Sequence, residues 1–469
     1  MDVITTDLCI IGAGSGGLSL AAGAVQMGAR VVLIEAGEMG GDCLNTGCVP
    51  SKTLLAAAKT AQVLRKGAAG VVGAEPQIDF AAVMAQVAAV IAGIAPVDSQ
   101  ARFERLGVQV IRAFARFTGP REVEAGGQRI RARRFVIATG SHPMIPQVSG
   151  LSDLPYLTNE TIFAQTKLPA HLLILGAGPI AMEMAQAHRR LGSKVTVIAR
   201  STALGREDPE AAAVVIAALR AEGVTILEGQ DAARFRATAA GVEAVLADGT
   251  TLTGSHVLVA VGRVPAIAGL NLEVAGVAYT ARGVTVGPNL RSSNRRVYAV
   301  GDVAGGLQFT HVAGAHAGVV IRQILLGLPA HAAKVVPWVT YTDPELAQIG
   351  LTEAAARAKH PDVTVIKQDF AHNDRALTEA RAEGFLKLML VKGRPVGVTI
   401  VGAQAGELIG LWALAVSARL KISAITGMIA PYPTRGEISK RAAGAYFSPQ
   451  LFDNPKLKWL VGFVQRWLP

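Results

Sequence analysis

Cysteine is scarce in this sequence: only 3 of its 469 residues are cysteine, and none follows Cys48. So low a count excludes a secreted fold held together by disulfides. It predicts a cytoplasmic protein, because thiols stay reduced in the cytosol. It also leaves too few ligands for a cysteine-based zinc site, so we expect no resident metal.

Signals for secretion or membrane insertion are also lacking. Asp2 and Asp7 flank the first apolar run, which argues against a signal peptide. The stretch nearest to a membrane span covers residues 81–97, but it is too short and lies between Asp79 and Asp98. It predicts a helix packed inside a soluble domain.

Acidic residues are outnumbered, with 35 Asp and Glu against 46 Lys and Arg, which gives a net charge of +11. The basic residues are scattered apart from a short run at 131–134, and no aromatic residues are interleaved with that run. We therefore expect no nucleic-acid partner. The excess charge favours solubility and attracts an anionic coenzyme.

What the sequence does contain is a pair of cysteines, Cys43 and Cys48, just before a predicted helix. Their separation is short enough to close a disulfide within one turn of chain, and Pro50 suits the first turn of the helix. The positive end of that helix and Lys52 both favour the thiolate form of Cys48. The pair predicts a redox-active disulfide; a structural disulfide or half of a metal site is the alternative. Cys9 lies in an apolar run and is predicted to be a buried small hydrophobic residue.

A dinucleotide-binding fingerprint precedes the cysteines. Residues 9–17 run from an apolar strand through a glycine turn into a helix. Gly12 permits the tight turn, Gly14 lets backbone N–H groups approach a pyrophosphate, and Gly17 allows close packing. Glu35 ends the next strand and can accept hydrogen bonds from ribose hydroxyls. The cysteine pair is therefore predicted to lie beside a flavin.

A second fingerprint begins near residue 172, with Gly176 and Gly178 in its turn. Its next strand, 194–199, ends in Arg200 instead of an acid, and Arg206 follows six residues later. Two guanidinium groups suit the additional phosphate of NADPH, whereas NADH is favoured by an acid at this position. We predict NADPH as the electron donor; the alternative is that both arginines are solvated loop residues.

With these features, the sequence resembles the class I flavoprotein disulfide reductases, in particular their mercuric reductase-like and dihydrolipoamide dehydrogenase-like members. The resemblance extends over essentially the whole chain. Four further motifs carry it: Ala138-Thr139-Gly140, Val261-Gly262-Arg263-Val264-Pro265, Ala299-Val300-Gly301-Asp302 and Tyr341-Thr342-Asp343-Pro344-Glu345.

The resemblance implies an α/β fold with two Rossmann-like dinucleotide-binding domains and a C-terminal α+β dimerisation domain. The implied limits are 1–148 with 265–336 for the FAD domain, 149–264 for the NAD(P) domain and 337–469 for the interface domain.

The resemblance also implies roles for individual residues. Cys48 would face the flavin, and Cys43 would exchange electrons with the acceptor. Lys52 would pair with Glu183 near the reactive edge of the flavin, where a cation stabilises the negative charge of reduction. Taken singly, Lys52 and Glu183 could also be ordinary solvated or helix-face charges.

The remaining FAD contacts come from the shared motifs. Asp302 would bind the ribityl chain, and Thr310 would open a helix directed at the flavin pyrimidine ring. Thr139, Gly140 and Arg263 are the other cofactor-binding residues that the motifs imply. His311 is left out of the catalytic set, because backbone N–H groups at that helix end need no particular side chain.

Tyr432 is the main departure from the pattern. Disulfide reductases of this family have a histidine there, which moves a proton across the dimer and is held by a glutamate matching Glu437. A phenol titrates near about 10 and an imidazole near about 6.5, so Tyr432 is a poor proton shuttle at neutral pH. An obligatory homodimer follows if this residue completes the partner's site. Packing at the dimer seam is the alternative role.

The sequence thus predicts an NAD(P)H- and FAD-dependent oxidoreductase acting on a small acceptor. Mercuric reductases also carry a tyrosine at this position, which favours a thiolate-bound metal ion as the acceptor. They carry paired C-terminal cysteines as well, and this chain has none. A small disulfide reduced without the histidine is the alternative acceptor.

The last segment, 455–469, is a candidate amphipathic helix with tryptophans and basic residues. It could pack on a partner subunit or touch an anionic membrane surface. A membrane-associated flavoprotein electron donor is therefore a second alternative function.

Overall fold

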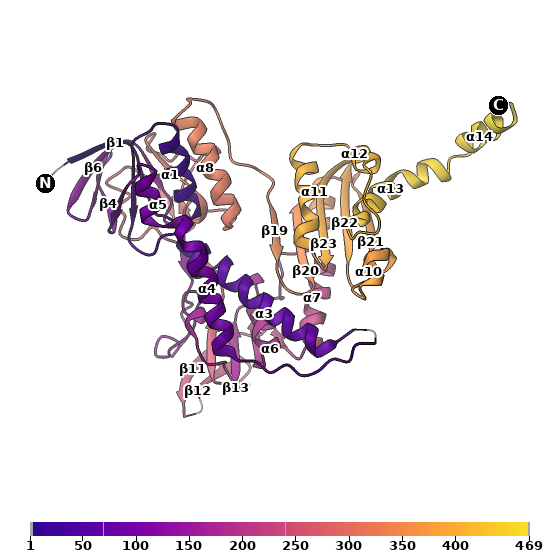
Figure 1. The fold of residues 1–469 in the computed structure, drawn as a ribbon, viewed down its shortest axis with the longest axis horizontal. Helices are drawn as coiled ribbons and strands as arrows, with labels where there is room; N and C mark the ends of the chain where they lie inside the picture. Colours follow the sequence, from indigo (N-terminus) through magenta and orange to yellow (C-terminus); the bar gives the residue numbers. More distant parts are fainter. Residues whose placement is uncertain (1–2, 69, 240, 468–469) are drawn as a thin grey trace. The chain divides into compact units, whose positions relative to one another are not determined.

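The computed structural model of the chain describes residues 3–68, 70–239 and 241–467 (Figure 1). The chain forms two compact units. The first unit contains Met1–Ser201 and Gly223–Lys334, and the second contains Thr202–Glu222 and Val335–Pro469. The finer limits that the sequence predicts for three domains remain predictions.

The first unit contains a 7-stranded sheet with the order β3-β2-β1-β6-β5-β4, in which β18 also pairs with β6. The strands around β1 are parallel, and β4 and β5 extend the sheet in antiparallel fashion. Near-continuous Val, Ile and Leu runs form these central strands because both faces of a parallel sheet are buried. The strands are β1 Val3–Ile11, β2 Val31–Glu35, β3 Gln109–Arg112, β4 Ala115–Gly119, β5 Glu122–Ala125, β6 Gln128–Ile137 and β18 Val297–Ala299.

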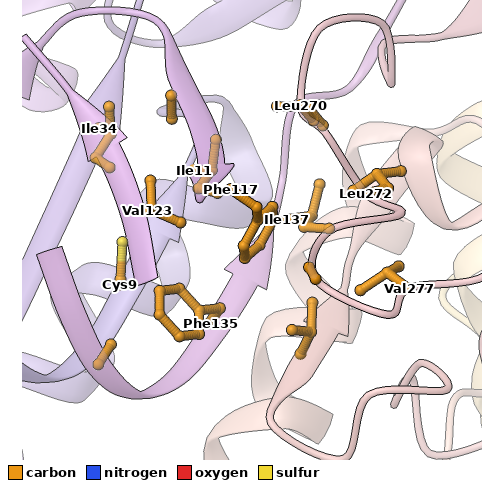
Figure 2. Close-up of a cluster of buried hydrophobic side chains, with 14 of the residues drawn as sticks. Cys9, Ile11, Ile34, Phe117, Val123, Phe135, Ile137, Leu270, Leu272 and Val277 are labelled. Carbon is orange, nitrogen blue, oxygen red and sulfur yellow. The ribbon is translucent and has the colours of Figure 1, made fainter. Parts of the chain in front are cut away.

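Alternate residues of this sheet point to opposite faces. On one face, Leu8 and Ile10 belong to a core that includes α1 and α8. On the other face, Cys9 and Ile11 pack in a core with Phe135 (Figure 2). Cys9 is fully buried and burial raises its pKa, so its predicted role as a small hydrophobic residue is confirmed. The helices of the first core are α1 Ser15–Gln26, α5 Gln100–Arg105 and α8 Thr310–Ile324.

Helix α4, Phe80–Asp98, corresponds to the apolar stretch of the sequence. The predicted helix is confirmed, but the prediction that it packs inside its domain is wrong. Only Phe80, Met84 and Val87 are buried, because one side of α4 contacts α3, Cys48–Lys66, and its other apolar residues are left partly or fully exposed. By length and composition alone, residues 80–105 could cross a membrane. Only 17% of the most apolar 18-residue stretch within them is buried.

The first unit also repeats the strand, glycine turn and helix pattern in a 4-stranded parallel sheet with the order β10-β9-β8-β14. Helix α6, Pro179–Arg190, follows its glycine turn. The strands of this sheet are β8 His171–Leu175, β9 Lys194–Ala199, β10 Thr225–Glu228 and β14 His256–Val259. The other strands of the unit are β7 Ser141–Pro143, β11 Ala232–Thr238, β12 Gly241–Leu246, β13 Thr251–Gly254, β15 Arg263–Pro265, β16 Tyr279–Thr280 and β17 Gly283–Val284.

The second unit is built on a 5-stranded antiparallel sheet with the order β19-β20-β23-β22-β21. Its core surrounds the fully buried Trp412, whose indole N–H donates to Ser439 Oγ at 3.1 Å. The strands are β19 Pro337–Thr340, β20 Glu345–Gly350, β21 Thr364–Asp369, β22 Phe385–Val391 and β23 Arg394–Gly402. The helices are α7 Pro209–Ala221, α9 Glu353–Lys359, α10 Asp374–Thr378, α11 Ala405–Ser417, α12 Ile422–Gly427, α13 Glu437–Phe452 and α14 Pro455–Trp467.

Candidate active site

The two glycine turns adopt backbone conformations that other residues rarely tolerate. Gly12 and Gly176 have φ values of +109° and +108°. A Cβ at these positions would lie 2.3 Å from the carbonyl oxygen of Ala138 and 2.4 Å from that of Ala260. A Cβ at Gly17 would lie 1.9 Å from the Gly12 oxygen. The structure therefore requires glycine at all three positions.

Open space lies in front of both turns. Gly14 and Gly178 are the N-caps of α1 and α6, and a glycine has no side chain that could cap the first-turn N–H groups. A Cβ on Gly178 would meet nothing within 4 Å, and one on Gly14 would meet only Gly41 Cα, at 3.9 Å. The first-turn N–H groups at each helix end can therefore approach a pyrophosphate group closely. Both turns fit a bound dinucleotide.

The residues at the two strand ends differ as the sequence predicts. Glu35 ends β2, and its carboxylate accepts hydrogen bonds from the N–H groups of Ala13 at 2.5 Å and Gly37 at 2.7 Å. These bonds anchor the Glu35 carboxylate beside the first glycine turn. Arg200 directly follows β9 and is exposed, whereas Arg206 belongs to the second unit. Within the first unit, Arg200 is therefore the cation at the second strand end.

The two cysteines lie on adjacent helices. Cys43 is on the short helix α2, Gly41–Asn45, and Cys48 is the first residue of α3. Pro50 lies in the first turn of α3, as predicted. Neither cysteine forms a disulfide in this structure, and the two side chains share a hydrogen bond. The Thr310 hydroxyl lies 3.3 Å from the Cys48 sulfur, a side-chain contact that the sequence did not predict.

The environment divides the two thiols into a thiolate and a proton donor. The pKa of Cys48 is lowered to about 6, chiefly by the hydrogen bond with Cys43, with further contributions from Thr310 and from the positive charge of Lys52. The pKa of Cys43 is raised well above its ordinary range, chiefly by the same hydrogen bond and by burial. These contacts therefore favour the thiolate at Cys48 and the protonated thiol at Cys43. This result agrees with the predicted acidity of Cys48.

Lys52 and Glu183 form the ion pair that the resemblance implied. The Lys52 ammonium lies 2.7 Å from a carboxylate oxygen of Glu183, which is on α6. The Glu183 side chain is only 6% exposed, so its charge is held in one place by the fold. The pair sets a fixed cation one helical turn from Cys48.

A network of polar side chains beside the cysteines joins the predicted Arg263 and Asp302 to two residues that the sequence analysis missed, Asp42 and Ser141. The Arg263 guanidinium is 3.4 Å from the Asp42 carboxylate, and its Nε donates to Ser141 Oγ at 2.7 Å. Ser141 in turn donates to Asp302 at 2.6 Å. Burial raises the pKa of Asp302, while Ser141 and Arg263 oppose that rise. Asp42 directly precedes Cys43, and this adjacency was the one signal for it in the sequence.

Thr139 and Gly140 join two distant segments next to this network. The Thr139 hydroxyl donates to the Ala266 carbonyl at 2.7 Å, and the Ala266 N–H donates to the Gly140 carbonyl at 3.0 Å. Gly140 has a φ of +70°. These bonds connect the residues after β6 to the residue after β15. Arg263 is the first residue of β15.

Tyr432 and Glu437 lie in the second unit, in one short segment before and at the start of α13. Tyr432 is 69% exposed, and its hydroxyl donates to the Asp374 carboxylate at 3.1 Å. The hydrogen bond to Asp374, followed by the negative charge of that carboxylate, raises the pKa of Tyr432. One carboxylate oxygen of Glu437 is buried without a hydrogen-bond partner among the described residues. Tyr432 therefore presents a protonated phenol at the surface.

Replacing Thr310 by valine should raise the pKa of Cys48 by on the order of one unit, because the hydroxyl that stabilises the thiolate is removed. Since the thiolate exists above the pKa, its pH titration should move to higher pH. The ultraviolet absorbance of the thiolate, measured as a difference from Cys48→Ser, follows this change. Thr60→Val, which removes a hydroxyl bonded only within α3, is the matched control. An unchanged titration in Thr310→Val would show that the Thr310 contact does not stabilise the thiolate.

Comparison with known proteins identifies the family. The model of the pyridine nucleotide-disulphide oxidoreductase family matches residues 6–317, and that of its dimerisation domain matches residues 336–443. This chain belongs to that family. The oxidoreductase is therefore a flavoprotein disulfide reductase, for which the family implies FAD and a pyridine nucleotide, and its dimerisation domain indicates a homodimer. The predicted fold class, with a C-terminal dimerisation domain, is confirmed.

Curated relatives of this oxidoreductase fall into two groups. It is 35% identical over 455 residues to the mercuric reductase of Acidithiobacillus ferrooxidans. This match covers 94% of this chain and 82% of that protein. It is 37% identical over 458 residues to the dihydrolipoyl dehydrogenase of Thermus scotoductus. This match covers 94% of this chain and 97% of that protein. The two groups act on different acceptors, so their names do not select one for this enzyme.

Solved structures show the same fold. LpdA from Mycobacterium tuberculosis matches with a TM-score of 0.87 and 27% identity, covering 94% of this chain and 99% of that one. The HOCl-induced flavoprotein disulfide reductase RclA from Escherichia coli, solved as a Cu(II) complex, matches with a TM-score of 0.85 and 28% identity, covering 93% and 99%. Among the described residues of this oxidoreductase, no group of three or more His, Cys, Asp or Glu side chains is placed to hold a metal.

Proposed function

We propose that this oxidoreductase is a cytoplasmic homodimer that uses NADPH to reduce a thiolate-bound metal ion at the Cys43 and Cys48 pair. The observation that carries the proposal is the state of Tyr432. Its phenol is hydrogen-bonded to Asp374, which raises its pKa and keeps it protonated at neutral pH. Such a group cannot take up and return the proton of an exchanging thiol, as disulfide reduction requires.

The residues of the site have distinct tasks in this reaction. FAD, when bound, would carry two electrons from NADPH to the cysteine pair. Lys52, fixed by Glu183, stabilises negative charge that develops beside Cys48. Cys48 supplies a thiolate at neutral pH, and Cys43 is the thiol that meets the acceptor. The hydroxyl of the partner subunit's Tyr432 would complete the acceptor site across the dimer, next to the buried carboxylate of Glu437.

The overall reaction balances for a mercuric ion held by two thiolates. NADPH gives two electrons and one hydride hydrogen; one further proton is taken up, and the products are elemental mercury, NADP⁺ and two free thiols. The proton can be taken directly from water, because this reaction forms no mixed disulfide between the enzyme and a small substrate. A protonated Tyr432 is therefore no obstacle to this reaction.

Two of the comparisons support a metal acceptor, since the relatives include mercuric reductases and RclA was solved with Cu(II). No cysteine follows Cys48 in this sequence, so we assign no C-terminal thiol to the delivery of the metal to Cys43. The likeness to a dihydrolipoyl dehydrogenase favours a second candidate, a small disulfide reduced at the same cysteine pair.

Initial rates of anaerobic NADPH oxidation distinguish the two acceptors. The holoenzyme is given mercuric ion in excess thiol, glutathione disulfide or lipoamide, and each rate is compared with that of Cys43→Ala. Turnover with the metal alone, dependent on Cys43, is the expected result. Fast turnover of either disulfide would overturn the metal assignment and establish the second candidate.

Introducing the missing base should improve the disulfide reaction. Tyr432→His is expected to raise the rate with lipoamide or glutathione disulfide at neutral pH by up to about 100-fold, because an imidazole titrates in that range. Tyr432→Phe, which removes only the hydroxyl, is the control and should leave the disulfide rates low. If the histidine variant gains nothing, the identity of residue 432 does not limit disulfide turnover.

The choice of NADPH depends on Arg200, the exposed cation after β9. Arg200→Glu should lower kcat/KM for NADPH relative to NADH by on the order of 10-fold or more, since a phosphate then faces a carboxylate. Arg220→Glu, on an exposed position of α7, tests whether any loss of positive charge has the same effect. An equal loss in both variants would show that Arg200 does not select the coenzyme.

A further inference from the structure

The last helix of the chain, α14, packs against nothing in its own unit. Figure 1 shows it beyond the end of α13, away from the strands β19 to β23. None of its described residues, 455–467, is buried. The match to the dimerisation domain ends at residue 443, so α14 lies outside the part of the chain that the family shares. Its large side chains therefore contribute nothing to the core of the second unit.

The exposed side chains of α14 are unusually apolar and aromatic for a solvated helix. Trp459 and Trp467 are each 71% exposed, and the rings of Trp459 and Phe463 stack at 5.8 Å. At 100° per residue, these three residues fall on one side of the helix. Leu457, Leu460, Val461 and Val464 widen the same face. Such a surface is costly to leave in water.

The charged side chains of α14 are all positive, since residues 455–467 include no Asp or Glu. Lys458 lies opposite the aromatic residues, Arg466 lies at the edge of the apolar face beside Trp459, and Lys456 lies on the aromatic side in the first turn. Long basic side chains can extend from an apolar face towards phosphate groups while their stems stay in an apolar environment. Tryptophans are favoured at the level of lipid headgroups for the same reason, because the ring is apolar and its N–H is polar.

The charge on α14 argues against pairing with a second copy of itself. Two such helices would bring together like charges with no acid on either to neutralise them. A lipid surface with anionic headgroups satisfies both faces at once, since it offers an apolar layer below a plane of negative charge.

We propose that α14 is a membrane-surface anchor, with Trp459, Phe463 and Trp467 inserted at the headgroup level of an anionic bilayer. Lys456, Lys458 and Arg466 contact the lipid phosphates. The helix lies in the plane of the membrane surface, since 13 residues at about 1.5 Å per residue are too short to cross it. This anchor is independent of which acceptor the active site reduces.

Vesicle binding by the full-length holoenzyme tests the proposal. Vesicles of equal parts phosphatidylcholine and phosphatidylglycerol are compared with vesicles of phosphatidylcholine alone, by co-sedimentation at low salt. Three basic residues predict tighter binding to the anionic vesicles by on the order of 100-fold. Tryptophan fluorescence should shift to shorter wavelength on binding, and Trp459→Ser with Trp467→Ser should remove both the shift and most of the binding.

A matched pair of charge reversals separates a local effect from the charge of the whole protein. Lys456→Glu with Lys458→Glu should weaken binding to anionic vesicles by on the order of 10-fold or more. Lys359→Glu with Lys421→Glu changes the same number of exposed lysines elsewhere in the second unit and should leave binding unchanged. Equal loss in both variants would overturn the proposal, because binding would then follow net charge.

Deletion of the residues after Asp453 provides the final test, with flavin content and circular dichroism as checks that the enzyme remains folded. Loss of vesicle binding from an intact dimer is the expected result. Retained vesicle binding, or dissociation of the dimer in solution, would overturn the membrane anchor; dissociation would show that α14 packs on the partner subunit.

Discussion

Replacing Cys43 with alanine is expected to lower acceptor-dependent oxidation of NADPH by on the order of 1,000-fold or more, because the thiol that meets the acceptor is lost. The same change should raise the thiolate pKa of Cys48, since the hydrogen bond from Cys43 is the largest cause of its lowered value. The turnover number with thiol-buffered mercuric ion, measured anaerobically, tests the first effect.

The half-reaction with NADPH should survive in this variant. Cys48, Lys52 and Glu183 remain in place, so NADPH should still bleach the flavin at close to the wild-type rate in a stopped-flow experiment. Cys9→Ala is the matched control, since Cys9 is a fully buried thiol in a core that takes no part in the chemistry. Substantial metal turnover by Cys43→Ala would mean that the acceptor takes electrons without the dithiol, and the proposed mechanism would be wrong.

A second large effect is expected in the second unit, at Lys387. This side chain is only 3% exposed, and its ammonium lies 3.0 Å from Asp208, 2.8 Å from Glu210 and 2.9 Å from Glu353. Lys387→Met should lower the free energy of unfolding of the second unit by about 3–5 kcal/mol, because Asp208 is left as an uncompensated buried charge. Urea denaturation of the holoenzyme at one fixed protein concentration measures the loss.

Lys367 is the control for this prediction. It pairs with Glu210 at 2.6 Å, but its side chain is 42% exposed, so solvent screens the interaction. Lys367→Met should change the free energy of unfolding by less than about 1 kcal/mol. Equal effects of the two substitutions would show that burial does not distinguish these ion pairs, and the assignment of Lys387 as the central cation of the cluster would fail.

The local features of the candidate site could be predicted from the sequence. A glycine turn between a strand and a helix depends on residues within about ten positions, so Gly12, Gly14 and Gly17 were identified without a fold. The same is true of Cys48 at a helix N-terminus beside Pro50. Lys52 and Glu183 are 131 positions apart, and only the resemblance to a known family suggested that they meet.

Other contacts could not be predicted, because they depend on how distant segments pack. The chain of contacts from Asp42 through Arg263 and Ser141 to Asp302 brings together four separate regions of the sequence, and nothing local marks its members as partners. The cluster around Lys387 is similar, since a lysine inside an apolar strand gives no sign of the acids that neutralise it.

Helix α4 shows a different limit. Its sequence is apolar on all sides, so composition predicts a buried helix, but the fold offers a packing partner on only one side. Burial is a property of the neighbours that the tertiary structure provides, and a composition-based prediction cannot count them.

By itself, the sequence determined that the chain carries two dinucleotide-binding turns and an acidic cysteine, because backbone sterics and a helix terminus act within a few residues. The tertiary structure decided how that cysteine is tuned. The contacts of Thr310 with Cys48 and of Asp374 with Tyr432 join positions that are distant in the sequence, and the Glu183 carboxylate that fixes Lys52 lies on another helix. The hydrogen bonds and charges that shift a pKa most are those within a few ångströms, so the pKa values that govern the chemistry are set by three-dimensional neighbours.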